Sequence, residues 1–144
     1  MQRHPAYPAS RYKPAPLADL SVRAERERLS PAALRAFFTI MTRWQVRDED
    51  ARALLGGVTN GPFYEMKKNP ERVLDVDRLL RISYLIGIFK ALNVLYSEAL
   101  ADAWMRHPNT NDIFAGQTPL AYLTTGGLPA MQVVRRLLDA RRAG

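Results

Sequence analysis

Apolar residues recur along most of this chain at intervals of three and four, the spacing that places them on one face of a helix. The run Leu34, Phe37, Phe38 and Met41 is typical of the pattern. No alternating pattern is long enough to indicate a strand, so we expect an all-α fold. The expected helices cover residues 30–45, 48–55, 60–69, 75–96, 97–106, 118–126 and 129–144.

Cap residues, prolines and glycines mark the expected helix ends. A cap residue followed by proline is a helix-start signal, and it occurs at Ser30-Pro31 and Thr118-Pro119. The pairs Gly56-Gly57 and Gly126-Gly127 are placed to stop helices. The helix expected over residues 75–96 is apolar on a wide part of its circumference, which predicts a central position among its neighbours.

The first 29 residues differ from the rest in being rich in proline. Prolines at positions 5, 8, 14 and 16 disfavour a helix and favour extended chain. We therefore expect a flexible, basic N-terminal arm over residues 1–29, with order beginning at residue 30. Two alternatives stay open: residues 19–29 form a short charged helix, or the arm lies on nucleic acid or on a second subunit.

Composition narrows the class of protein further. The 144 residues carry a formal charge of +7, which favours an anionic partner: nucleic acid, an acidic protein surface or a membrane face. Cysteine is absent, which fits a reducing compartment. The N-terminus leads into no apolar core, and the most apolar stretch, residues 79–96, is interrupted by Arg81 and Lys90. We expect a soluble cytoplasmic protein without a membrane segment.

The sequence contains no recognisable catalytic or metal-binding motif. The two histidines, His4 and His107, have no second metal-type ligand at a suitable spacing. The glycine-containing segment 56–61 lacks the lysine and the preceding strand of a phosphate-binding loop. Carboxylates fall at helix starts and on expected surfaces. We therefore expect no catalytic residues, no metal and no cofactor, and hence a protein that is not an enzyme.

Residues 44–69 have the spacing of a helix-turn-helix, which is a short helix, a tight glycine-containing turn and a second helix packed across the first. An ordinary helical hairpin fits the spacing equally well. If the motif binds DNA, its second helix presents groups that read bases or hold phosphates. The candidate DNA-binding residues are Thr59, Asn60, Tyr64, Lys67 and Lys68.

The C-terminal third carries a more specific constellation: a tryptophan, a Pro-Asn turn, a glycine before a Pro-Leu helix start, a leucine, a further glycine, and a last helix with valine and leucine. Here the positions are Trp104, Pro108, Asn109, Gly116, Pro119, Leu120, Leu123, Gly126 or Gly127, Val133 or Val134, and Leu137. Gly116 and Gly126 are expected to adopt positive φ in the connections. This constellation resembles the toxin-binding domain of the Xre/MbcA/ParS-like antitoxins, and with the helix-turn-helix the resemblance covers residues 30–144.

The resemblance implies a division into a helix-turn-helix domain over residues 30–96 and a small helical toxin-binding domain over residues 97–144. It also implies that the partner is a RES-domain toxin that consumes NAD, whose NAD pocket the antitoxin covers. Promoter DNA is the second implied partner, and a homodimer and larger toxin–antitoxin assemblies are the implied oligomers. The runner-up is a freestanding helix-turn-helix transcriptional regulator with no toxin.

The last helix is the expected inhibitory element. Its apolar side is expected to pack on its own domain, and its other side is rich in arginine, whose guanidinium matches phosphate oxygens bidentately. The alternative is a solvated helix end that the helix dipole favours. The candidate toxin-binding residues are Asn109, Phe114, Gly116, Pro119, Arg135, Arg136, Arg141, Arg142 and Gly144.

Overall fold

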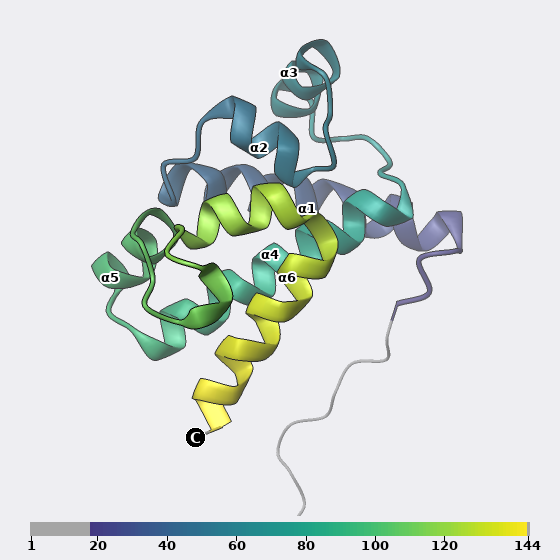
Figure 1. The fold of residues 1–144 in the computed structure, drawn as a ribbon. Coiled ribbons are helices and arrows are strands. Elements are labelled where there is room, and N and C mark those ends of the chain that lie inside the picture. The colour runs from purple at the N-terminus through teal and green to yellow at the C-terminus, as the bar shows by residue number, and fades with distance from the viewer. Residues whose placement is uncertain (1–17, 144) are drawn as a thin grey trace, which may run out of the picture.

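The computed structural model describes residues 18–143 of the chain. Figure 1 shows its helices. Residues 18–143 contain no strand, which confirms the expected all-α fold. The elements are α1 (Arg23–Arg43), α2 (Asp48–Leu54), α3 (Asn60–Lys68), α4 (Val76–Leu95), α5 (Glu98–Ala103), two short 3₁₀ turns, η1 (Trp104–Arg106) and η2 (Asp112–Phe114), and α6 (Pro119–Ala143).

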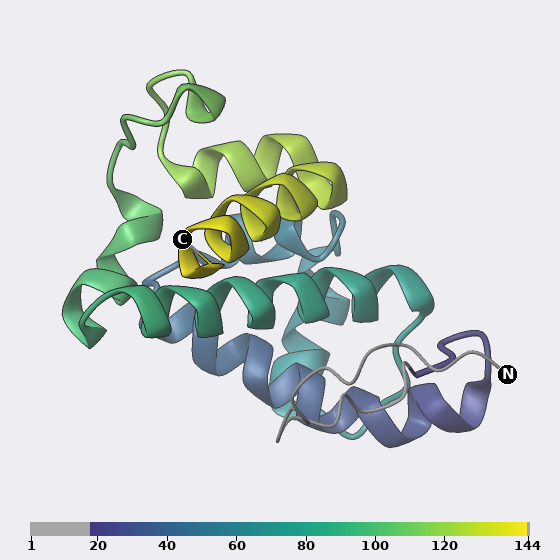
Figure 2. The same cartoon turned by 90° about the horizontal axis from the view of Figure 1, so that it is seen from below.

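Helix α4 lies at the centre of the fold, as its wide apolar face predicts. Figure 2 shows it between α1 on one side and α6 on the other, and its packing contacts are made chiefly with these two helices. Ile82, Leu85, Ile88 and Leu92 of α4 have no exposed surface. A helix that is buried on several sides needs such a broad apolar circumference, because each neighbour covers a different part of it.

Helix α1 begins at Arg23, so the prediction that order starts at Ser30 is wrong. The first turns of α1 are exposed and carry short-range ion pairs, with Arg23 2.9 Å from Glu27. Ser30 is not a cap: its buried hydroxyl donates to the carbonyl of Arg26 and accepts from the backbone N–H of Leu74. Residues 1–17 of the predicted arm lie outside the described residues.

Helix α6 is broken at Gly127, as the glycine pair predicts. Gly127 has φ 63° and ψ −144°, a backbone conformation that is essentially confined to glycine. Gly116 has the expected positive φ, whereas the expectation for Gly126 is wrong because its neighbour Gly127 takes that conformation. Gly126 is needed for a different reason, since a Cβ atom there would lie 2.6 Å from the Cβ of Ala130.

One hydrophobic core runs through all the helices. Trp44 of the expected helix-turn-helix part and Phe114 and Leu138 of the expected toxin-binding part belong to the same buried cluster as Ile88. The boundary expected between residues 96 and 97 therefore does not separate two cores. Within residues 18–143, no helix is both long and apolar enough to cross a membrane.

The break in α6 leads to a prediction about stability. Gly127→Ala should destabilise the fold by about 1–3 kcal/mol, because alanine is strained in this conformation. The matched control is Gly61→Ala in α3, where an added Cβ meets open space. The control should be neutral or gain up to about 1 kcal/mol from helix propensity. Urea unfolding measured by tryptophan fluorescence compares the two variants, and equal stability of both would contradict the role of Gly127.

Candidate functional site

The candidate DNA-reading helix is α3, which follows α2 after a turn containing two glycines. Gly56 and Gly57 both have positive φ, at 93° and 89°, so the turn has the geometry that the glycine pair predicts. Phe63 and Met66 of α3 point into the core. All five candidate DNA-binding residues are exposed, which are Thr59, Asn60, Tyr64, Lys67 and Lys68.

The charge around α3 is balanced rather than basic. Residues 47–72 contain five lysines and arginines and five aspartates and glutamates, so their formal charges cancel. The ammonium group of Lys67 lies 3.2 Å from the carboxylate of Asp48, at the start of α2. Exposed Glu65 lies on α3 itself. Attraction of this surface to phosphates therefore depends on few cations, with Lys68 making no ion pair within residues 18–143.

The loop between α5 and α6 is held by local hydrogen bonds and by aromatic packing. The side-chain oxygen of Asn109 accepts from the backbone N–H of Asn111. Phe114 is fully buried and makes edge-on contacts with Trp104 and Tyr122, at centroid distances of 5.8 and 5.3 Å. These rings fix the loop against the start of α6.

The structure separates the loop residues that were expected to meet a toxin. Phe114 and Pro119 are buried, so their side chains support the surface from inside. Gly116 is exposed with φ 81°, and Asn109 is half-buried. Thr118 caps α6, because its hydroxyl oxygen accepts from the backbone N–H of Ala121 at 3.1 Å.

The four arginines of the last helix are not equivalent. The Nε atom of Arg135 donates to the carboxylate of Asp139, at 3.0 and 3.1 Å, and its guanidinium lies so close to α4 that a Cβ on Gly87 would overlap it. Arg136 is exposed and makes no ion pair within residues 18–143. Arg141 donates to the hydroxyl of Tyr96 at 3.1 Å.

Arg142 lies 3.9 Å from the carboxylate of Asp139. It lines a groove of about 590 Å³ between α4 and α6, together with Arg135 and Lys90. The end of α6 is thus strongly basic, but part of that charge faces α4. Gly144, the last candidate residue, lies outside the described residues.

A second groove lies at the break in α6. It has a volume of about 260 Å³ and is bordered by Gln117, Tyr122, Thr125, Gly126, Pro129, Ala130 and Val133. We call it the kink groove. None of its lining residues carries a charge, and the surface they offer is mainly apolar. The groove was not predicted from the sequence, because its shape depends on the angle between the two halves of α6.

One ion-pair cluster joins the end of α1 to α5. Arg43 at the end of α1 donates from Nε to Asp102 of α5 at 2.7 Å and lies 3.2 Å from Glu98. Its guanidinium also stands over the ring of Phe89, 5.2 Å from the centroid. The hydrogen bond to Asp102 raises the pKa of Arg43, a group that is protonated at physiological pH in any case.

Comparison with known proteins gives two findings. The family model described as the antitoxin Xre/MbcA/ParS C-terminal toxin-binding domain matches residues 90–144, which span the end of α4 and everything after it. The chain is also similar to "Uncharacterized protein y4oB" of Sinorhizobium fredii (strain NBRC 101917 / NGR234), with 38% identity over 115 residues that cover 79% of this chain and 87% of that protein. No solved structure matches the chain.

The difference between neighbouring arginines predicts different effects of their removal. Arg135→Ala should lower the free energy of unfolding by about 0.5–1 kcal/mol, because a half-exposed ion pair and the packing of the side chain on α4 are lost. Arg136→Ala should change stability by less than about 0.5 kcal/mol, as surface substitutions usually do. Thermal and urea unfolding test both; a larger loss for Arg136→Ala would show that the arginines are assigned to the wrong roles.

Proposed function

Because the chain belongs to the Xre/MbcA/ParS family of antitoxins, with a toxin as its protein partner, we propose that it neutralises a RES-domain toxin that consumes NAD. It does so by binding, not by catalysis, and covers the mouth of the toxin's NAD pocket. The observation that carries this proposal is the position of the matched residues, 90–144, which include the whole of the arginine-rich helix α6.

The end of α6 is the proposed inhibitory element. It places Arg136, Arg141 and Arg142 on exposed positions at the tip of the chain, with Asp139 as the only acidic residue nearby in sequence. A pocket that binds a dinucleotide offers hydrogen-bond donors to its phosphates. A guanidinium is itself a donor without an acceptor, so it binds only where the pocket mouth also presents acceptor groups. Steric occlusion by the helix end is therefore the main effect, and the arginines fix its orientation.

Repression of the antitoxin's own operon is the proposed second activity. It is supported by the exposure of all five candidate residues on and before α3 and by the two-glycine turn that precedes them. The balanced charge of residues 47–72 means that binding would rely on a homodimer, in which two α3 helices contact neighbouring half-sites. A freestanding regulator without a toxin is the alternative. An adjacent gene for a RES-domain protein would distinguish the antitoxin from it.

Deletion of residues 140–144 tests the inhibitory element. The truncated chain should fold normally, since residues 140–143 are exposed and chain ends contribute little to the core. It should still bind the toxin through the rest of residues 90–144 but protect cells poorly. Growth and cellular NAD should therefore fall when the truncated chain is co-expressed with the product of the adjacent gene.

The control for this deletion is the full-length chain expressed at the same level. Circular dichroism establishes that both chains are folded, and co-purification establishes that both bind the toxin. Full protection by a folded, truncated chain would place the inhibitory contact earlier, around residues 109–123.

Replacement of Lys67 and Lys68 by alanine tests DNA binding. Binding to the promoter should weaken and its salt dependence should decrease by up to about two units of log–log slope, because each phosphate contact contributes about 0.9. Toxin neutralisation should not change. The matched control removes two positive charges elsewhere, with Arg23→Ala and Lys90→Ala on α1 and α4. If both double variants bind promoter DNA equally well, α3 does not contact the DNA.

A further inference from the structure

A long part of the C-terminal region carries no charge at all. Between Asp112 and Arg135, twenty-two consecutive residues include no lysine, arginine, aspartate, glutamate or histidine. About a quarter of the whole chain is charged, so a gap of this length is a marked local departure from the composition. The gap begins within η2 and covers the loop after it and α6 as far as Val134.

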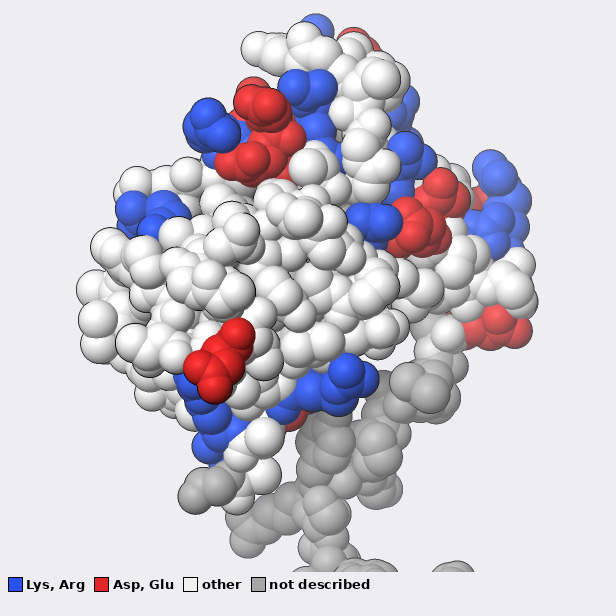
Figure 3. Space-filling view, in the orientation of Figure 1, with Lys and Arg blue, Asp and Glu red and all other residues white. Residues whose placement is uncertain are grey.

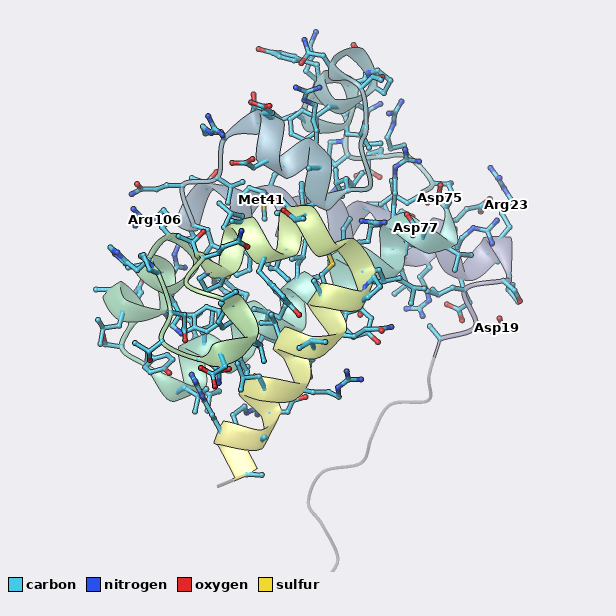
Figure 4. All side chains as sticks on the ribbon, in the orientation of Figure 1. Asp19, Arg23, Met41, Asp75, Asp77 and Arg106 are labelled. Atoms are coloured by element: carbon cyan, nitrogen blue, oxygen red, sulfur yellow. The ribbon has the colours of Figure 1, made fainter. Side chains whose placement is uncertain are left out.

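These residues form one side of the molecule. Figure 3 shows a broad, largely uncharged face over α6 and the loop before it; one acidic residue lies on its lower part, and the other charged residues are gathered around its edges. Figure 4 shows Arg106 on one side of α6 and Asp75 and Asp77 on the other. A surface with an uncharged centre and a charged rim has the arrangement of a protein–protein interface.

The kink groove lies within this face. Its volume of about 260 Å³ is below the range of about 300–1,000 Å³ that small-molecule sites occupy, and is suited to a single large side chain. Its walls come from both halves of α6, with Tyr122 and Thr125 before Gly127 and Pro129 and Val133 after it. The groove is preformed, because the glycine conformation fixes the angle between the halves.

The walls are also rigid. Tyr122 packs edge-on against the buried ring of Phe114, and Ala130 is almost fully buried beneath the groove. Pro129 has a fixed φ, which stiffens the start of the second half of α6. A rigid groove loses little conformational entropy when a side chain enters it, and interface energy concentrates at such sites.

We propose that the toxin docks on this uncharged face and inserts one apolar or aromatic side chain into the kink groove. The inference rests on the proposed function and adds to it the place where affinity arises, as distinct from the arginine-rich end that blocks the pocket. A toxin is the occupant because the face lies wholly inside residues 90–144, which the family description assigns to toxin binding. Nucleic acid is disfavoured, since a surface without cations offers phosphates no partner.

Thr125→Arg tests the proposal. Thr125 is exposed on the first half of α6, so the variant should fold, while a long charged side chain would obstruct the groove. The matched control is Thr39→Arg, an equally exposed threonine on α1, which lies on the other side of α4. The full-length chains are titrated against the purified product of the adjacent gene by calorimetry, after circular dichroism has shown that both are folded.

We expect Thr125→Arg to weaken binding by about tenfold or more, as is usual when a central anchor is lost, and Thr39→Arg to leave binding unchanged. Hydrogen exchange should show protection of residues 117–133 in the complex of the parent chain. Equal binding by both variants, or no protection of these residues while the parent binds, overturns the proposed groove but leaves the proposed function standing.

Two further outcomes concern the occupant. If the parent chain does not bind the product of the adjacent gene at all, the proposed function fails and the groove proposal fails with it. If light scattering shows that the chain alone dimerises and that Thr125→Arg makes it a monomer, the groove is occupied by a second copy of the chain and the toxin is the wrong partner.

Discussion

The course of α6 depends on a single backbone conformation, and much of the structure depends on the course of α6. At Gly127 the helix turns, and α6 packs chiefly on α4, with further contacts to α2. A residue with a side chain would resist this conformation by about 1–3 kcal/mol. The core contacts of Leu123 before the turn and of Met131, Val134 and Leu138 after it are compatible only because the turn exists.

Glycines also permit close contacts within α6 and between α6 and α4. Gly126 allows the helix to close against Ala130, and Gly87 of α4 leaves room for the guanidinium of Arg135. The side chain of Arg81 on α4 likewise lies close to two glycines, Gly56 after α2 and Gly127 in α6. These contacts tie the α2–α3 turn to the break in α6, so the two surfaces proposed for DNA and for toxin rest on a common set of glycines.

Most of the fold was predictable because helix periodicity and helix ends are local properties of the sequence. The starts of α4 and α6 follow from Asp75 and Thr118, whose side chains cap their own helices. Asn60, the expected cap of α3, is instead its first residue, and the helix has no side-chain cap. The start of α1 was not predictable in this way. Ser30 and Pro31 form a genuine start signal, but the hydroxyl of Ser30 is used to hold Leu74, forty-four residues away, and the helix continues through the proline.

The candidate site also contains features that the sequence predicts and features that it does not. The exposure of Lys67, Lys68 and Arg136 follows from helical periodicity and was predictable. The burial of Phe114 and the packing of Arg135 on Gly87 depend on contacts between distant elements, and no local pattern indicates them. The kink groove has a signal that was available, the uncharged run of residues 113–134, but its depth follows from a tertiary angle.

The continuity of the core limits how such a protein can be assembled from parts. Buried residues of the segment 97–144 belong to the same core cluster as those of α1 and α4, so this segment would expose apolar surface if it were joined to an unrelated partner at residue 97. An exchange of toxin specificity between two antitoxins would keep its core intact only if α4 travelled with α6, together with the matching face of α1. Recombination is therefore expected to transfer whole chains, while new specificity arises by substitutions on the surface of α6.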